Sequence, residues 1–185
     1  MKSFFLKTKG WQIFLLMCFV PMLLQIIYQI TAGVPTNQTY VPGSPVFAFT
    51  IYGFYLLWVY SIADFFTKLL NQTPKYLKIS FAISFIYILY YSFFVLTNIH
   101  YIGSSGVRTL LHFTLQILFM IVFFYLLYHA SKALRAVELN REVSFRDAFA
   151  DFLCFLFFPV GVWFVQPRVR KLYRLSNEAE KTYER

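Results

Sequence analysis

The chain of 185 residues is 59% hydrophobic and 22% aromatic, and only 14% of its residues are charged. A soluble domain of this length would carry about 25% charged residues, so long uncharged apolar stretches place the chain among integral membrane proteins. Its net charge of +9 comes from basic residues between these stretches. That pattern is typical of juxtamembrane anchors and argues against a nucleic-acid partner.

Four apolar stretches are long enough to cross a hydrocarbon core of about 30 Å as helices. They cover residues 11–30, 46–66, 79–97 and 109–128. The first follows a basic N-terminal segment, as in a signal peptide, but it is too long for an h-region and no A-x-A site follows it. We therefore predict an all-α membrane protein with four transmembrane helices in a single membrane domain, residues 1–185.

A fifth apolar stretch, residues 149–165, is harder to assign. Its 17 residues would rise about 25 Å as a straight helix, slightly less than the core thickness. Pro159 and Gly161 predict a bend within it, and a full crossing would bury Asp151. We favour a re-entrant or interfacial helical hairpin over residues 145–166, and a fifth span is the alternative.

After Pro167 the basic tail, residues 168–185, reads as a short amphipathic helix that frays after Asn177. The positive-inside rule then fixes the orientation. With four spans and both termini inside, sixteen of the 17 Lys and Arg residues lie on the inner side and only Arg108 lies outside. A crossing of residues 149–165 would move six of them outward, so the charge distribution favours the hairpin.

Two polar pairs have a structural interpretation from spacing alone. Ser144 and Asp147 fit a capping box that starts a new helix. Asp64 and Lys68 lie one turn apart at the inner end of the second predicted span, where an i,i+4 ion pair makes the carboxylate tolerable. A proton or cation site at Asp64 is the alternative.

A polar stripe runs along the third predicted span. Its members recur at helical spacing and so share one face: Ser80, Ser84, Tyr87, Tyr91 and Asn98. Ser80 and Ser84 also allow another backbone to approach closely. We predict that the stripe packs against the helix bundle or a partner protein, and a hydrophilic conduit is the alternative.

Catalytic and cofactor motifs are absent from the sequence. There is no Walker A, G-x-G-x-x-G, H-E-x-x-H or G-x-S-x-G pattern. His112 and Gln116 lie one turn apart without a third metal ligand nearby, so we interpret them as a hydrogen-bonded pair. The two cysteines, Cys18 and Cys154, form no C-x-x-C. We predict no enzyme activity, no cofactor and no metal site.

The run FPVGVWFVQPR, residues 158–168, resembles a segment of small multi-pass bacterial inner-membrane proteins of unassigned function, of the Bacteroidota type. The resemblance covers eleven residues. It implies a bacterial inner membrane and a cytosolic C-terminus, and it implies no active-site residue.

We therefore expect a non-catalytic membrane subunit that docks on a larger inner-membrane complex for translocation, secretion or transport. A small channel or transporter is the first alternative, and an interfacial lipid-binding protein or lipid enzyme is the second. The candidate docking residues are Pro159, Gly161, Trp163 and Gln166. The candidate contacts to anionic lipid head groups are Arg168, Arg170, Lys171 and Arg174.

Overall fold

A computed structural model describes the backbone of residues 2–31, 45–72, 74–95 and 106–183. Its elements are helical throughout this part of the chain. They are α1 (Lys2–Lys7), α2 (Gly10–Thr31), α3 (Pro45–Leu69), α4 (Leu77–Tyr90), the π-helical turn η1 (Tyr91–Val95), α6 (Gly106–Leu139), α7 (Phe145–Leu156) and α8 (Phe158–Tyr183). The all-α prediction is confirmed for these residues.

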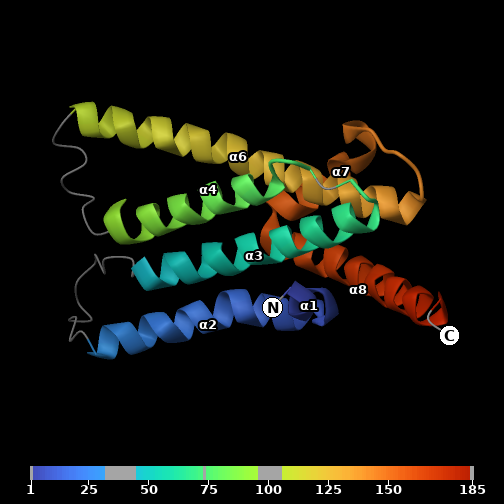
Figure 1. Cartoon of the computed structure of the whole chain (residues 1–185). Helices are drawn as coiled ribbons and strands as arrows, with labels where there is room; N and C mark the ends of the chain where they lie inside the picture. The colour runs from blue at the N-terminus through green and yellow to red at the C-terminus, as the bar shows by residue number, and fades with distance from the viewer. Residues whose placement is uncertain (1, 32–44, 73, 96–105, 184–185) are drawn as a thin grey trace.

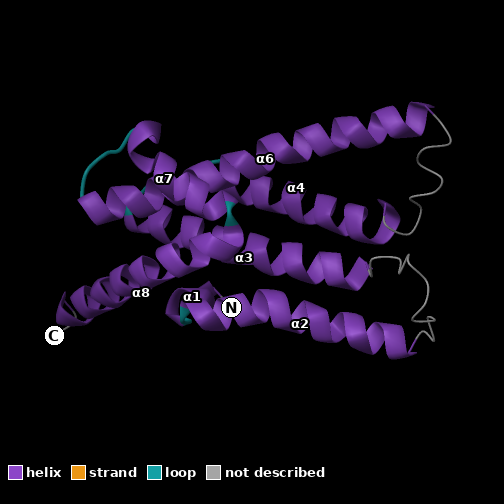
Figure 2. Cartoon of the chain, turned by 180° about the vertical axis from the view of Figure 1, so that it is seen from behind, coloured by secondary structure: helices purple, strands orange, loops and turns teal. Residues whose placement is uncertain are grey.

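Helices α2, α3, α4 and α6 lie side by side as an elongated bundle (Figures 1 and 2). At the end of the bundle where α3 and α6 finish, α1, α7 and α8 gather around it (Figure 1). Helix α3 contacts α1, α2, α4 and α6, which makes it the central helix. The helices therefore differ in how much of their surface the rest of the chain covers.

Burial differs sharply among the three helices that are long and apolar enough to cross a membrane. In α3, 61% of the most apolar window is buried inside the chain, against 17% in α2 and 11% in α6. Large side chains such as Ile30 and Leu110 are exposed. A water-soluble monomer rarely exposes apolar surface on this scale, so the apolar faces of α2 and α6 are typical of a membrane-embedded protein.

The third predicted span, residues 79–97, is shorter in the structure than the others. The helical stretch Leu77–Phe93 is apolar but has only 17 residues, and η1 follows α4 from Tyr91. Asn98 and the rest of residues 96–105 lie outside the described residues. Among the described residues, three helices thus meet the length and composition expected of a membrane span, where the sequence predicted four.

Helices α3 and α6 end in the same way. Asn71 and Asn140 both adopt a left-handed backbone, with φ of 54° and 49°. In each case the next N–H reaches back five residues, from Gln72 to the Thr67 carbonyl and from Arg141 to the Ala136 carbonyl. These are the bonds of a Schellman cap, in which asparagine can replace the usual glycine.

The capping box at the start of α7 is confirmed. The Asp147 N–H donates to the Ser144 hydroxyl, and the Ser144 N–H donates to the Asp147 carboxylate. Helix α6 continues beyond the predicted end of the fourth span at residue 128, to Leu139. The sequence therefore located the α6–α7 junction correctly.

The helix boundary in the FPVGVWFVQPR region differs from the prediction. The break falls on Phe157, whose N–H still bonds to the Leu153 carbonyl. Pro159 lies in the first turn of α8, where a missing N–H costs nothing. Helix α8 then continues through Pro167 to Tyr183 without the separate tail helix or the fraying that we expected. The contacts of its middle section, described next, explain this continuity.

Candidate functional site

The candidate site is the α7–α8 pair, the two helices that meet at Phe157. Its central side chain is Gln166, which is completely buried. The Trp58 indole N–H donates to the Gln166 carbonyl oxygen at 2.9 Å, and the Gln166 amide donates to the carbonyls of Phe5 and Thr8 at 2.6 and 2.8 Å. One amide thus joins α8 to α3 and to α1.

The bend of the α7–α8 pair is closed by two further contacts. The Tyr55 hydroxyl donates to the carbonyl of Phe155, in the last turn of α7. A Cβ built on Gly161 would lie 1.5 Å from the Cys154 carbonyl oxygen. Only glycine allows this approach of the α8 backbone to the end of α7.

A charge cluster closes the open end of the pair. The Arg168 guanidinium donates to both oxygens of Glu138 on α6 and to both oxygens of Asp151 on α7, one of the latter bonds being 3.1 Å. Glu138 also pairs with Arg135 at 3.1 Å. The planar guanidinium is suited to two carboxylates at once. Arg168 therefore joins α6, α7 and α8.

The four candidate docking residues divide into two groups. Gly161 and Gln166 are buried and hold the pair together, whereas Pro159 and Trp163 are exposed. Trp163 is 51% exposed, and next to it Phe164 and Val160 are 62% and 60% exposed. The sequence run therefore supplies both the internal anchor and the apolar outer face.

The candidate head-group contacts also divide. Arg168 is committed to Glu138 and Asp151. Lys171 and Arg174 are exposed on the same helix, and Arg170 is partly exposed. Three of the four basic side chains thus remain accessible on the surface of α8.

The polar stripe of α4 turns toward its helical neighbours. Ser80, Ser84 and Tyr87 are buried. The Tyr87 hydroxyl donates to the Gln116 side-chain oxygen on α6, and its ring stacks on Phe119 with centroids 4.4 Å apart. Tyr91 stacks on His112 at 6.3 Å. Gln116 therefore pairs with Tyr87, where the sequence analysis expected it to pair with His112.

A cavity of about 410 Å³ lies between the bend of the α7–α8 pair and helices α3, α4 and α6. Its walls are mostly aromatic and include Tyr55, Tyr87, Phe123 and Phe158. The hydroxyls of Tyr55 and Tyr87 already bond within the protein. Tyr52, Tyr91 and Gln116 also line the cavity, which is therefore a mostly apolar space with a few polar groups in its wall.

The Asp64–Lys68 ion pair is confirmed, with 2.9 Å between the Lys68 ammonium and the Asp64 carboxylate. Among the described residues, no group of three His, Cys, Asp or Glu side chains could hold a metal ion. In the described part of the chain, Asp64 therefore forms an ion pair with Lys68 and belongs to no three-ligand metal group.

Sequence analysis missed the partners of the site. Glu138, Tyr55 and Trp58 contact the α7–α8 pair from α6 and α3, more than ten residues away along the chain. The available signal was chemical, because a buried tryptophan or tyrosine needs a partner for its polar hydrogen. Comparison with protein-family models, with curated proteins and with solved structures found no match to this chain.

Proposed function

We propose that this chain is a non-catalytic subunit of a bacterial inner-membrane complex, and that it docks through a re-entrant hairpin formed by the α7–α8 pair. In this proposal α2, α3, α4 with η1, and α6 cross the membrane, and both termini are cytosolic. The positive-inside distribution of the sequence supports this orientation.

The depth of the bend supports re-entry. The Phe145 ring contacts Tyr128 with centroids 5.6 Å apart, so α7 begins beside the predicted inner end of the fourth span. The Phe158 ring contacts Tyr55 at 5.0 Å, and Tyr55 contacts Phe123 at 5.8 Å. Along their helices, Tyr55 lies about 16 Å from the predicted inner end of the second span at Phe66, and Phe123 lies about 8 Å from that of the fourth span at Tyr128.

The hydrogen bonds of the bend suit a membrane depth. An irregular backbone in the hydrocarbon region must be satisfied by protein. The Phe155 carbonyl receives the Tyr55 hydroxyl, and the Phe157 carbonyl receives the N–H groups of Val160 and Gly161. A bend that lay in water would need no such partner from α3.

The fixed geometry of the exposed face carries the docking proposal. Lipid chains solvate any apolar surface, whereas a protein partner requires a defined shape. Gln166 and Arg168 lock the pair to three helices, and this lock presents Trp163, Phe164 and Val160 in one arrangement. Exposed aromatic residues of this kind supply much of the binding energy at protein interfaces.

Site-specific photocrosslinking in intact cells tests the proposal. A photoreactive amino acid at Phe164 should crosslink to one membrane protein of defined mass, which also copurifies with the wild-type chain in mild detergent. The matched control is Ile121, 62% exposed on α6 and far along the chain from the pair, where crosslinks to lipid alone are expected. Lipid crosslinks at both positions, together with isolation as a lone monomer, would rule the docking proposal out.

Topology needs its own measurement. A reporter that is active only outside the cytoplasmic membrane should be inactive when fused to the C-terminus and active in the segment between α2 and α3. An active C-terminal fusion would replace the re-entrant hairpin by a fifth span.

A further inference from the structure

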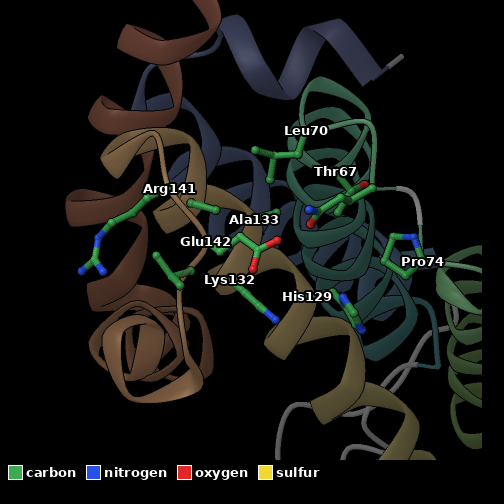
Figure 3. Close-up of a pocket in the computed structure, with 11 residues that line it drawn as sticks. Thr67, Leu70, Pro74, His129, Lys132, Ala133, Arg141 and Glu142 are labelled. Carbon is green, nitrogen blue, oxygen red and sulfur yellow. The ribbon is translucent and has the colours of Figure 1, made fainter.

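A second cavity, of about 210 Å³, lies at the end of the bundle that holds the basic residues. It is enclosed by the end of α3, the segment before α4, the last turns of α6 and the connection to α7 (Figure 3). The side chains that matter for its chemistry are Thr67, Gln72, Pro74, His129, Lys132 and Glu142.

The position of this cavity along the helices corresponds to the predicted membrane surface. Thr67 directly follows the predicted second span, and His129 directly follows the fourth. Pro74 stands shortly before the third. The cavity therefore lies at the inner ends of three neighbouring predicted spans, which is the level of lipid head groups at the inner face.

The charges in the cavity are of both signs. Figure 3 shows the Lys132 ammonium and the Glu142 carboxylate directed into the same space, with the His129 ring beside them, while the Arg141 guanidinium points away. No described side chain forms a salt bridge with Lys132 or Glu142; the Lys132 ammonium lies over the Tyr128 ring at 5.7 Å. Both groups therefore remain available to a ligand.

We propose that this cavity binds the phosphoethanolamine head group of a membrane lipid, with its phosphate on Lys132 and His129 and its ammonium group on Glu142. The proposal depends on the membrane placement of the helices and not on the docking function. It commits to a lipid because the cavity lies at the ends of the predicted spans.

Size and charge select this head group over two others. The volume corresponds to about seven water molecules at liquid density, which suits a phosphate with a short amine. The ammonium group can donate hydrogen bonds to Glu142, whereas the trimethylated amine of phosphatidylcholine has no hydrogen to donate. Phosphatidylglycerol offers no cation to Glu142, so the carboxylate disfavours it.

Native mass spectrometry of the full chain, delipidated and then titrated with lipids of identical acyl chains, measures this preference. We expect phosphatidylethanolamine to bind about tenfold more tightly than phosphatidylcholine or phosphatidylglycerol, as one charge-assisted hydrogen bond would give. Equal binding of the three lipids would overturn the proposal. Soluble phosphoethanolamine should compete weakly, and competition as strong as by the lipid would assign the cavity to a free metabolite instead.

Charge variants connect the preference to the cavity. Glu142→Gln should remove the preference, and Glu142→Lys should reverse it toward phosphatidylglycerol. Lys132→Gln should weaken phosphatidylethanolamine and phosphatidylcholine alike, because both carry the phosphate. The controls Glu178→Gln and Lys9→Gln make the same charge changes outside this cavity, and should leave binding unchanged. A retained preference in Glu142→Lys that still shows the wild-type melting temperature would refute the assignment.

Discussion

The Trp58 indole N–H donates a hydrogen bond of 2.9 Å to the side-chain oxygen of Gln166, between residues 108 positions apart. Both side chains are completely buried. Buried polar groups are costly when unpaired. This bond and the two that the Gln166 amide donates therefore hold the C-terminal helix α8 against α3 and against α1 near the N-terminus.

Trp58→Phe tests this bond. The change leaves the Gln166 oxygen without its donor and removes part of a buried ring, so we expect unfolding in detergent to become easier by about 2–3 kcal/mol. Trp163→Phe makes the same substitution at an exposed position and should stay within about 0.5 kcal/mol. Equal effects of the two substitutions would show that Gln166 does not depend on Trp58.

Gly161→Ala tests the close approach of α7 and α8. The new methyl group would lie 1.5 Å from the Cys154 carbonyl oxygen, so the backbones must separate, and we expect a loss of about 3 kcal/mol or more. Gly53→Ala is the matched control, because a Cβ there meets nothing within 4 Å. It should be stabilising by about 0.5–1 kcal/mol.

Thermal melts of the two alanine variants, with limited proteolysis of the α7–α8 pair, provide the readout. Protease cleavage near Phe157 should increase only in Gly161→Ala. A Gly161→Ala protein as stable as the wild type would mean that the two helices are not packed as the structure has them.

Arg168→Gln tests the charge cluster. It leaves Glu138 and Asp151 without the guanidinium that pairs both. We expect a loss of about 2–3 kcal/mol, less than the 3–5 kcal/mol of a fully buried pair, because the Arg168 side chain is 29% exposed. Arg174→Gln, on the exposed side of α8, should change stability little.

The double variant Arg168→Gln/Glu138→Gln separates pairing from packing. Removing the carboxylate should recover part of the loss, because one unpaired charge disappears. If the double variant is destabilised by the full sum of the two single losses, Arg168 acts through its packing alone.

The capping box predicts a dependence on pH. Hydrogen bonds from the Ser144 backbone N–H and hydroxyl hold the pKa of Asp147 below its usual range. The stabilising contribution is therefore complete above the unfolded-state pKa, near 3.9, and is lost as the pH falls through the lower folded-state value. Amide exchange in the first turn of α7 should accelerate, relative to the intrinsic rate, across that acid range.

Asp147→Asn is the comparison for this titration. Its amide keeps the size of the side chain but does not titrate, so the acid-dependent part of the exchange should disappear. An unchanged profile in Asp147→Asn would assign the acid sensitivity to another carboxylate.

Local chemistry made much of this architecture readable from the sequence. The apolar lengths of α2, α3 and α6, the capping box at Ser144 and the ion pair between Asp64 and Lys68 each depend on residues within a few positions of one another. Such features follow from helical spacing and from the length of apolar run that a membrane requires, and both can be read directly from the sequence.

The tertiary structure alone decided where the helix breaks and what holds it. Pro159 and Gly161 predicted a bend at their own positions, yet the break fell on Phe157. Gly161 serves the contact with Cys154, and Pro167 stays within a helix anchored on both sides by Gln166 and Arg168. Partners from α1, α3 and α6 determine these roles. No local pattern reports them, because residues this far apart in the chain meet only after folding.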